Sequence, residues 1–349
     1  MQYRQLGSSS LNVSAVCLGS MTWGKQNTQQ EAEQQIAIAA DAGINFIDTA
    51  EMYAVPPSED TYGATESIIG NWLAKQPEAR DKWIIASKIA GPGISWIRDG
   101  GKMSAQTFQQ ALDGSLKRLQ TDYIDLYQLH WPNRPHPHFA RHWPHSGLLS
   151  DTNNYDTDDM LAILEAAQQA IQAGKIRYLG LSNETPWGIS QYLRLAAAHQ
   201  LPRIVSLQNE YNLLHHKDCP YVLEQCLAEN IGYLAWSPLA GGALTGKYLG
   251  GARPPNSRWT LVQRNGLFRD TPQSQAAIAG YAELANAFNI TPAQLALAWV
   301  NQQVGVASTI IGATSDAQLA ENIAAFALEF SDRQREEIAT VMQAHPMAF

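Results

Sequence analysis

Eight short apolar runs, each rich in residues typical of β-strands, recur along the chain with helix-like segments between them. The runs cover residues 14–20, 44–50, 82–88, 123–130, 176–183, 203–212, 232–239 and 306–313. The clearest helix-like segments are residues 31–43, 104–120, 159–175 and 291–300. In the last of these, Thr291 is placed to cap the helix and Pro292 to occupy its first position.

This strict alternation predicts parallel strands joined by right-handed crossovers. Eight such units favour a closed (β/α)₈ TIM barrel over an open doubly wound sheet. An open sheet that binds a dinucleotide should carry G-x-G-x-x-G after its first strand. Here the first run leads into "LGSMTWGKQ", which lacks that pattern. Because no change in composition separates two domains, we predict one α/β domain over residues 1–349.

Two stretches depart from the repeat. Residues 1–14, "MQYRQLGSSSLNVS", predict a β-hairpin ahead of the barrel, with "GSSS" forming its turn. Residues 132–158 follow the fourth strand and are too long, and too rich in Pro and His, for a simple connection. Long loops are usually functional or disordered, and barrels place their active sites on this face.

Charge and composition exclude several classes of function. The formal net charge of −8 argues against a general nucleic-acid or anionic-membrane surface. No apolar run approaches the roughly 18 residues that would span a bilayer, and the first residues contain no signal-peptide core. The three cysteines show no C-x-x-C spacing and predict reduced thiols in a cytoplasmic protein.

Four ionisable residues end or follow three consecutive predicted strands: Asp48, Tyr53, Lys88 and His130. Each has an ordinary structural explanation if it is taken alone, such as a turn cap, a loop aromatic or a lysine that reaches water. Together, however, unpaired charges at such positions would cost several kcal/mol, so they should pair with one another.

A buried Asp48–Lys88 pair would leave the lysine charge close to the Tyr53 hydroxyl. A nearby cation favours phenolate, so we expect the pKa of Tyr53 to fall from about 10 toward neutral pH. Tyr53 would then be a usable general acid, and His130 could donate a second hydrogen bond to an oxygen that gains negative charge. Such a site suits a carbonyl that becomes an alkoxide.

A family resemblance rests on seven motifs in order, which span nearly the whole chain: "FIDTAEMY", "ASK", "YQLHWP", "GLSN", "LQNEYN", "AWSPLAGGALTGKY" and "IIGATSDAQLAEN". As a set they resemble the aldo-keto reductases. The segments "MTWGKQN" and "GKIRYLGLSNET" are similar to a bacterial branch of that family, the Tas type. The resemblance implies an oxidoreductase of the carbonyl reductase or alcohol dehydrogenase type, which transfers a hydride from NADPH to an aldehyde or ketone.

The resemblance also implies roles for individual residues. Tyr53 matches the proton donor of the family, with Asp48, Lys88 and His130 in support. The residues that match cofactor contacts are Ser182, Asn183 and Gln208 for the nicotinamide carboxamide, Trp236 for the nicotinamide ring, Ser237, Leu239, Gly241 and Lys247 for the pyrophosphate, Gly312, Thr314, Gln318, Glu321 and Asn322 for the adenosine end, and Arg258 for a 2′-phosphate. Ser315 and Asp316 stand where the family often has Arg or Lys, which weakens the case for NADPH over NADH.

Other readings of the sequence are weaker. "GGALTGKY" (241–248) nearly spells a P-loop, but Tyr248 replaces the magnesium-binding Ser or Thr. Five histidines between residues 130 and 145 suggest a metal site, yet few Cys or Glu lie nearby, so we expect no metal. The loop is better interpreted as shaping substrate access, with Trp131 and Trp143 as pocket walls.

Two other classes of function stay open at this point. One is a cofactor-sensing regulatory subunit of the same fold that acts by binding a partner. The other is a barrel isomerase or metal-dependent hydrolase, which would need a set of carboxylates or histidines that these strand ends lack. The physiological substrate, the favoured direction and the oligomeric state do not follow from the sequence.

Overall fold

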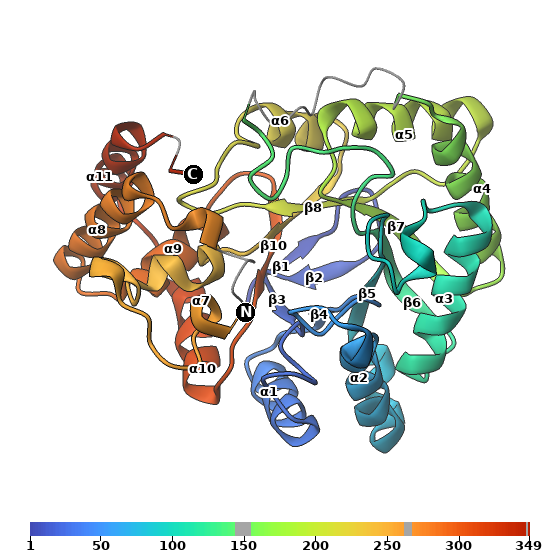
Figure 1. Ribbon diagram of the computed structural model, residues 1–349, viewed down its shortest axis with the longest axis horizontal. Coiled ribbons are helices and arrows are strands. Elements are labelled where there is room, and N and C mark those ends of the chain that lie inside the picture. The colour runs from blue at the N-terminus through green and yellow to red at the C-terminus, as the bar shows by residue number, and fades with distance from the viewer. Residues whose placement is uncertain (144–154, 262–266, 347) are drawn as a thin grey trace.

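Eight parallel strands close into a barrel in the computed structural model, which describes residues 1–143, 155–261, 267–346 and 348–349 (Figure 1). The strands are hydrogen-bonded in the order β10-β3-β4-β5-β6-β7-β8-β9. Their bounds are β3 (Val16–Gly19), β4 (Phe46–Asp48), β5 (Ile84–Ile89), β6 (Ile124–Leu129), β7 (Ile176–Ser182), β8 (Ser206–Glu210), β9 (Gly232–Trp236) and β10 (Val306–Ile311). Each predicted run overlaps one of these strands, and the predicted (β/α)₈ barrel is confirmed.

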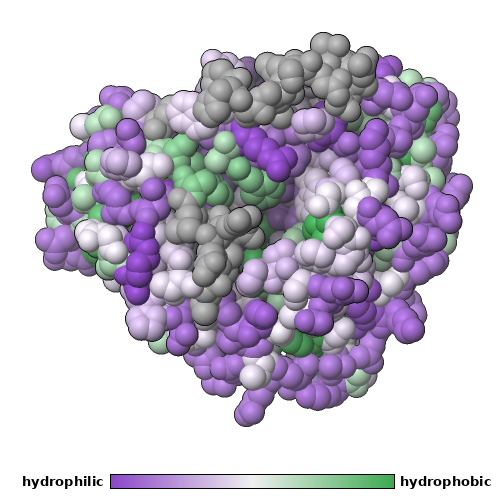
Figure 2. Space-filling view, in the orientation of Figure 1, coloured by the Kyte–Doolittle hydropathy of each residue, from purple (hydrophilic) through white to green (hydrophobic). Residues whose placement is uncertain are grey.

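Helices surround the strands (Figure 1). They are α1 (Gln29–Asp41), α2 (Ala64–Lys75), α3 (Ala105–Leu119), α4 (Asp158–Gln172), α5 (Pro186–His199), α6 (Tyr221–Ala228), α7 (Arg258–Leu261), α8 (Pro272–Ala287), α9 (Pro292–Asn301), α10 (Asp316–Ala324) and α11 (Asp332–Ala344). Among the described residues, no helix is both long enough and apolar enough to span a bilayer. The face seen in Figure 2 is largely hydrophilic at its edges, with hydrophobic residues gathered toward its centre.

Side-chain caps explain where several helices begin. Thr291 accepts a hydrogen bond from the backbone of Gln294 at the start of α9, and Pro292 occupies the first turn, as predicted. Helix α1 begins at Gln29, two residues earlier than the sequence pattern suggested. The reason is a capping box in which Thr28 and Glu31 satisfy each other's backbone N–H groups.

An N-terminal hairpin closes one end of the barrel. Strands β1 (Tyr3–Gln5) and β2 (Asn12–Ser14) pair antiparallel, which confirms the predicted hairpin. Leu6 and Val13 are fully buried against an interior cluster that includes Phe46 and Leu234. The turn fits so tightly that a Cβ at Gly7, whose φ is 54°, would lie 2.3 Å from a backbone oxygen. Polar side chains at the C-terminal strand ends therefore gather at the opposite end.

Candidate active site

Asp48 and Lys88 form a buried ion pair at the C-terminal ends of neighbouring strands. Asp48 is the last residue of β4, and Lys88 lies one residue before the end of β5. Lys88 Nζ lies 2.5 Å from Asp48 Oδ2 and donates a second hydrogen bond, of 2.8 Å, to the carbonyl oxygen of Thr49. The lysine side chain has no exposed surface. A buried ammonium is tolerated only with such partners, so the pair fixes both side chains.

Tyr53 and His130 lie beside this pair. The ammonium of Lys88 lies 5.0 Å from the centre of the Tyr53 ring, over its face. The His130 imidazole, which directly follows β6, meets the Tyr53 ring edge-on with 5.6 Å between ring centres. The structure therefore brings together all four ionisable residues that the sequence placed at the strand ends.

The pKa of Tyr53 differs in direction from the sequence-based expectation. Burial of the phenol raises this pKa above its ordinary value, while the Lys88 ammonium lowers it and the Asp48 carboxylate raises it again. The net direction is upward, because loss of water outweighs the single cation. The expectation that Lys88 brings the Tyr53 pKa toward neutrality is therefore wrong, and Tyr53 carries its proton at neutral pH.

The protonation states of the two neighbours are also set by burial and charge. Burial lowers the pKa of Lys88, but the Asp48 carboxylate and Tyr53 together outweigh burial and leave the pKa above its ordinary value. Burial, with help from the Lys88 charge, holds the pKa of His130 well below its usual range. At neutral pH the site thus contains an ammonium, a neutral imidazole and a phenol. The phenol and the neutral imidazole can therefore both donate hydrogen bonds to a substrate oxygen, and His130 carries no positive charge.

A pair of glutamines, one of them missed by sequence reasoning, orients Asp48 from inside the barrel. Gln208 donates a 2.8 Å hydrogen bond to Asp48 Oδ1, and Gln128 donates another of 3.2 Å. Gln208 also donates to the Gln128 side-chain oxygen at 3.1 Å. Gln128 lies two residues before His130, and residues two apart on a strand face the same side. That spacing was the signal that could have revealed it.

The predicted carboxamide residues border the same four side chains. Ser182 donates to the Gln208 carbonyl at 2.8 Å, and Asn183 donates through Nδ2 to the His130 carbonyl at 2.9 Å. The Oδ1 atom of Asn183 and the Nε1 atom of Trp236 are buried without a hydrogen-bond partner among the described residues. An acceptor and a donor left free beside the reactive side chains fit a carboxamide group.

The predicted pyrophosphate residues form a cationic turn after β9. Gly241, in the short helix Ala240–Thr245, adopts a φ of 66°, and a Cβ built there would lie 3.7 Å from Arg258. The Lys247 side chain folds back over Gly242, and a Cβ added to Gly242 would lie 3.2 Å from Lys247 Nζ. Ser237, with a φ of 56°, and the partly buried Leu239 lead into this turn. Backbone N–H groups and two cations make the turn suitable for a polyanion.

Arg258 lies against this turn, close to Tyr53. Its Nη1 contacts the sulfur of Met21 at 3.7 Å, and no carboxylate pairs with it among the described residues. Burial, followed by repulsion from Arg269, lowers the pKa of Arg258 to about 10, so the guanidinium keeps its charge. A cation without an anion beside a cationic turn fits a phosphate group. Its assignment to a 2′-phosphate stays a prediction.

The predicted adenosine-end residues lie in α10 and in the turn before it. Ser315 caps this helix, because its side chain accepts a hydrogen bond from the backbone N–H of Gln318. Thr314 donates through both its backbone N–H and its hydroxyl to Gln318, at 3.1 Å each. Asn322 donates to the Gly312 carbonyl at 3.4 Å. Glu321, the residue before it in the helix, is half-buried. A helix N-terminus with free N–H groups favours an anion.

The loop after β6 covers one side of the site. Trp131 packs against His130 with 4.9 Å between ring centres, and Phe139 lies 5.7 Å from the Trp236 ring. Arg134 ties the loop to the barrel through an ion pair with the buried Glu184. Trp143 is 37% exposed and contacts His142. Residues 144–154, including His145, lie outside the described residues.

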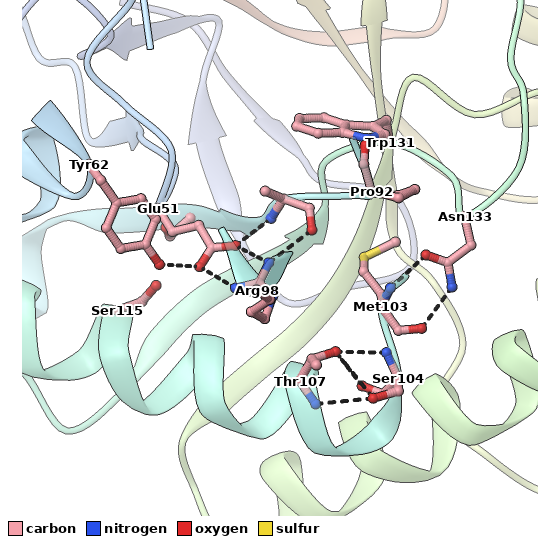
Figure 3. A network of polar contacts seen from close by, with 12 residues as sticks. Glu51, Tyr62, Pro92, Arg98, Met103, Ser104, Thr107, Ser115, Trp131 and Asn133 are labelled. Atoms are coloured by element: carbon pink, nitrogen blue, oxygen red, sulfur yellow. Dashed lines mark hydrogen bonds and ion pairs between the residues drawn. The ribbon is translucent and has the colours of Figure 1, made fainter. Parts of the chain in front are cut away.

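A second buried ion pair beside the site was missed by sequence reasoning. Glu51 lies between Asp48 and Tyr53 in the chain, and Figure 3 shows Arg98 and Tyr62 converging on its carboxylate. The only local signal is an acid inside the otherwise apolar and small "DTAEMY" segment. Its partner Arg98 is 47 residues away in the chain, so the pairing has no local signature.

The barrel and the convergent strand-end residues define a class, and the chain belongs to it: the aldo/keto reductase family, whose model matches residues 15–343. The chain is 45% identical to Protein tas of Escherichia coli K12 over 348 residues, which cover 99% of both chains. This confirms the resemblance to the Tas-type branch. The family makes the protein an oxidoreductase that acts on small molecules, and the family generally uses NAD(P)H.

Two further relatives are more distant. The uncharacterized oxidoreductase YrpG of Bacillus subtilis is 33% identical over 93% of this chain and 91% of its own. A probable voltage-gated potassium channel subunit beta of Arabidopsis thaliana is 32% identical, also over 93% of this chain and 91% of its own. The chain is thus similar in sequence both to oxidoreductases and to a channel subunit.

Proposed function

We propose that this protein is an NADPH-dependent reductase of aldehydes or ketones, of the carbonyl reductase or alcohol dehydrogenase type. The observation that carries the proposal is the buried Asp48–Lys88 pair with the Tyr53 ring over the ammonium and His130 at its edge. A protonated phenol and a neutral imidazole at one barrel end suit a carbonyl oxygen that gains negative charge.

The proposed chemistry assigns a task to each of the four residues. When bound, NADPH would supply a hydride for the carbonyl carbon. Tyr53 donates its phenolic proton to the carbonyl oxygen, and His130 donates a hydrogen bond to the same atom. Lys88 stabilises the phenolate that Tyr53 leaves behind, because its charge lies against the ring. Asp48 holds the lysine in place.

The cofactor would lie across the barrel mouth. Ser182, Asn183 and Gln208 would hold the carboxamide, and Trp236 offers a flat face for the nicotinamide ring. The turn around Gly241, with Lys247, would bind the pyrophosphate, and the start of α10 would bind the adenosine end. Arg258, which has no carboxylate partner among the described residues, fits a phosphate of the cofactor, and its assignment to the 2′-phosphate is the part of the proposal that favours NADPH over NADH.

A second candidate function is a cofactor-sensing regulatory subunit that acts by binding a partner. The similarity to a probable potassium channel subunit beta supports it. The two candidates differ in turnover rather than in cofactor binding. A regulatory subunit would bind NADPH tightly and reduce carbonyls negligibly.

Titration of NADPH and of NADH by tryptophan fluorescence, followed by a panel of aldehydes and ketones, separates the candidates. Fast multiple turnover with NADPH supports the reductase. Tight NADPH binding with negligible turnover, together with co-purification of one partner, supports the subunit. Equal affinity for NADH would contradict the assignment of Arg258 to a 2′-phosphate.

A further inference from the structure

Glu51 is a buried carboxylate to which the proposed reaction gives no task. Its side chain has no exposed surface, and its two oxygens accept four hydrogen bonds. Arg98 donates two of them in a fork, at 2.9 and 2.6 Å, while Tyr62 donates one of 2.8 Å and the backbone N–H of Ala90 one of 2.6 Å (Figure 3). A forked guanidinium pair with every acceptor used holds a side chain in one geometry.

The backbone of Glu51 is hydrogen-bonded to β5, the strand that carries Lys88. Its N–H donates to the Lys88 carbonyl at 3.2 Å, and its carbonyl accepts from Gly63 at 2.8 Å. Two residues later, the Tyr53 N–H donates to the Ala50 carbonyl at 3.1 Å. The turn that carries Tyr53 is therefore joined to β5 through the Glu51 backbone at Lys88 and through its side chain at Ala90.

Arg98 extends this support to His130. Its Nη2 donates to the Ala90 carbonyl at 3.0 Å, so it holds the start of the loop after β5. Trp131 donates through Nε1 to the Pro92 carbonyl of that loop at 3.0 Å (Figure 3). A Cβ at Gly91 would lie 2.3 Å from the same indole. Trp131 in turn packs on His130, so the loop fixes the indole that supports the imidazole.

We propose that Glu51 and Arg98 form a positioning pair. The pair holds the turn that carries Tyr53, and the packed rings of Trp131 and His130, at a fixed distance from Lys88. The inference rests on the proposed function, because it concerns the proton that Tyr53 donates and the hydrogen bond from His130. Both must reach one carbonyl oxygen, and a displacement of about 1 Å can cost on the order of a hundredfold in rate.

The N-terminal ends of β5 and of the neighbouring β6 offer a matched control. Asp125 is also buried, and its Oδ2 accepts from Arg80 at 2.7 Å and from the backbone N–H of Ile85 at 3.0 Å. Asp125 lies at the start of β6, and its Oδ1 also pairs with Arg177 at 2.9 Å, so it has the same carboxylate–arginine chemistry as Glu51 at the barrel end away from Tyr53. Asp125→Asn therefore removes a comparable buried carboxylate without touching the Tyr53 turn.

The first experiment compares Glu51→Gln with Asp125→Asn in steady-state carbonyl reduction. We expect Glu51→Gln to lower kcat by about 10- to 100-fold, with NADPH affinity by fluorescence within about twofold of wild type. We expect Asp125→Asn to keep kcat within about twofold. A Glu51→Gln enzyme with wild-type kcat, or an equal loss in both variants, overturns the proposal. Absence of turnover in the wild-type protein would instead contradict the proposed function.

A pH profile of the reverse reaction, alcohol oxidation, gives a readout that a purely stabilising role would not move. In this direction Tyr53 must be deprotonated, so the rate rises with pH through its pKa. The charged groups that face Tyr53 are Lys88 from β5, Asp48 from β4 and Arg258 from α7, and Glu51→Gln keeps all three. A turn that moves away from Lys88 loses the stabilisation of its phenolate, so the midpoint of the rise should move to higher pH in Glu51→Gln and not in Asp125→Asn.

Tyr62→Phe is the milder variant to use if Glu51→Gln does not fold. It removes one hydrogen bond to the Glu51 carboxylate and leaves the Arg98 fork in place. We expect a fall in kcat of a few fold and a midpoint shift in the same direction. An unchanged kcat and an unchanged midpoint in Tyr62→Phe would contradict the proposal.

Discussion

The Lys88 charge sits inside the barrel because Asp48 and one backbone carbonyl replace its water. Breaking a buried ion pair by removing one partner costs about 3–5 kcal/mol, because the other charge is left unpaired. We expect Lys88→Met to lower the free energy of unfolding by about that amount in urea titrations. The double variant Lys88→Met/Asp48→Asn should recover part of the loss, since no charge is left buried. A double variant less stable than the single one would refute the account of the pair.

His130 leads to a prediction about pH. Its pKa lies well below the usual range because burial and the Lys88 charge both disfavour the imidazolium. The imidazole is therefore neutral at neutral pH and stays neutral as pH rises. We expect kcat for carbonyl reduction to show no transition near pH 6.5 and to fall only at high pH, where Tyr53 loses its proton. A transition near pH 6.5 that disappears in His130→Gln would show that the imidazole titrates there.

At the residue scale, the sequence predicts what depends on local position. Asp48, Lys88 and His130 could be identified because each follows a strand pattern, and strand ends share one face of a barrel. The contacts of Glu51 and Gln128 could not, because their partners lie 47 and 80 residues away. The predicted direction of the Tyr53 pKa shift was wrong for the same reason, because the burial that raises this pKa depends on residues distant in the chain.

At the element scale, the close packing of α2 on α3 depends on one glycine. A Cβ at Gly70 would lie 2.1 Å from the backbone oxygen of Arg118, which cannot move without shifting α3. Gly70→Ala should therefore destabilise the protein by about 1–3 kcal/mol, as overpacking generally does.

Gly114 in α3 is the matched control for that prediction. A Cβ there would lie 3.1 Å from Arg118 Nη1, which is the end of a side chain and not backbone. Gly114→Ala should stabilise the protein by about 0.5–1 kcal/mol through helix propensity. Urea unfolding of both variants measures the change in unfolding free energy. A change of the same sign in Gly70→Ala and Gly114→Ala would contradict the packing argument.

The element boundaries show where local patterns are sufficient. Strand positions and the cap of α9 follow from periodicity and from Thr291–Pro292, which need no distant contact. The loop after β6 does not, because its position depends on Arg134 meeting Glu184, 50 residues later, and on Phe139 meeting Trp236. Long loops lack a repeating pattern that would predict such contacts.

At the scale of the whole molecule, the N-terminal hairpin fills one end of the barrel with apolar side chains, and the polar strand ends occupy the other. The alternation of strand and helix was enough to predict this architecture, because eight βα units of one hand have few ways to close. What the pattern could not show is how deeply individual groups are buried. Asp218 is such a group, in the segment between β8 and α6.

Burial raises the pKa of Asp218 to about 6, although hydrogen bonds from Asn209 and Tyr233 act in the opposite direction. The ordinary value in an unfolded chain is about 3.9. Because the folded state holds this proton more tightly, the contribution to stability is complete below pH about 4 and is lost as pH rises through 6. The difference in unfolding free energy between wild type and Asp218→Asn should therefore favour wild type by about 2 kcal/mol more at pH 4 than at pH 7. Urea titrations at the two pH values measure it, and a pH-independent difference would contradict the raised pKa.

The central claim is that Tyr53 donates the proton to a carbonyl oxygen, and Tyr53→Phe tests it most directly. The substitution removes one hydroxyl and keeps the ring that packs between Lys88 and His130. The measurement is NADPH-dependent carbonyl reduction, with NADPH affinity determined by tryptophan quenching on the same samples. The account predicts unchanged cofactor binding and a loss of turnover of at least about a hundredfold. Near-normal carbonyl reduction by Tyr53→Phe would contradict it.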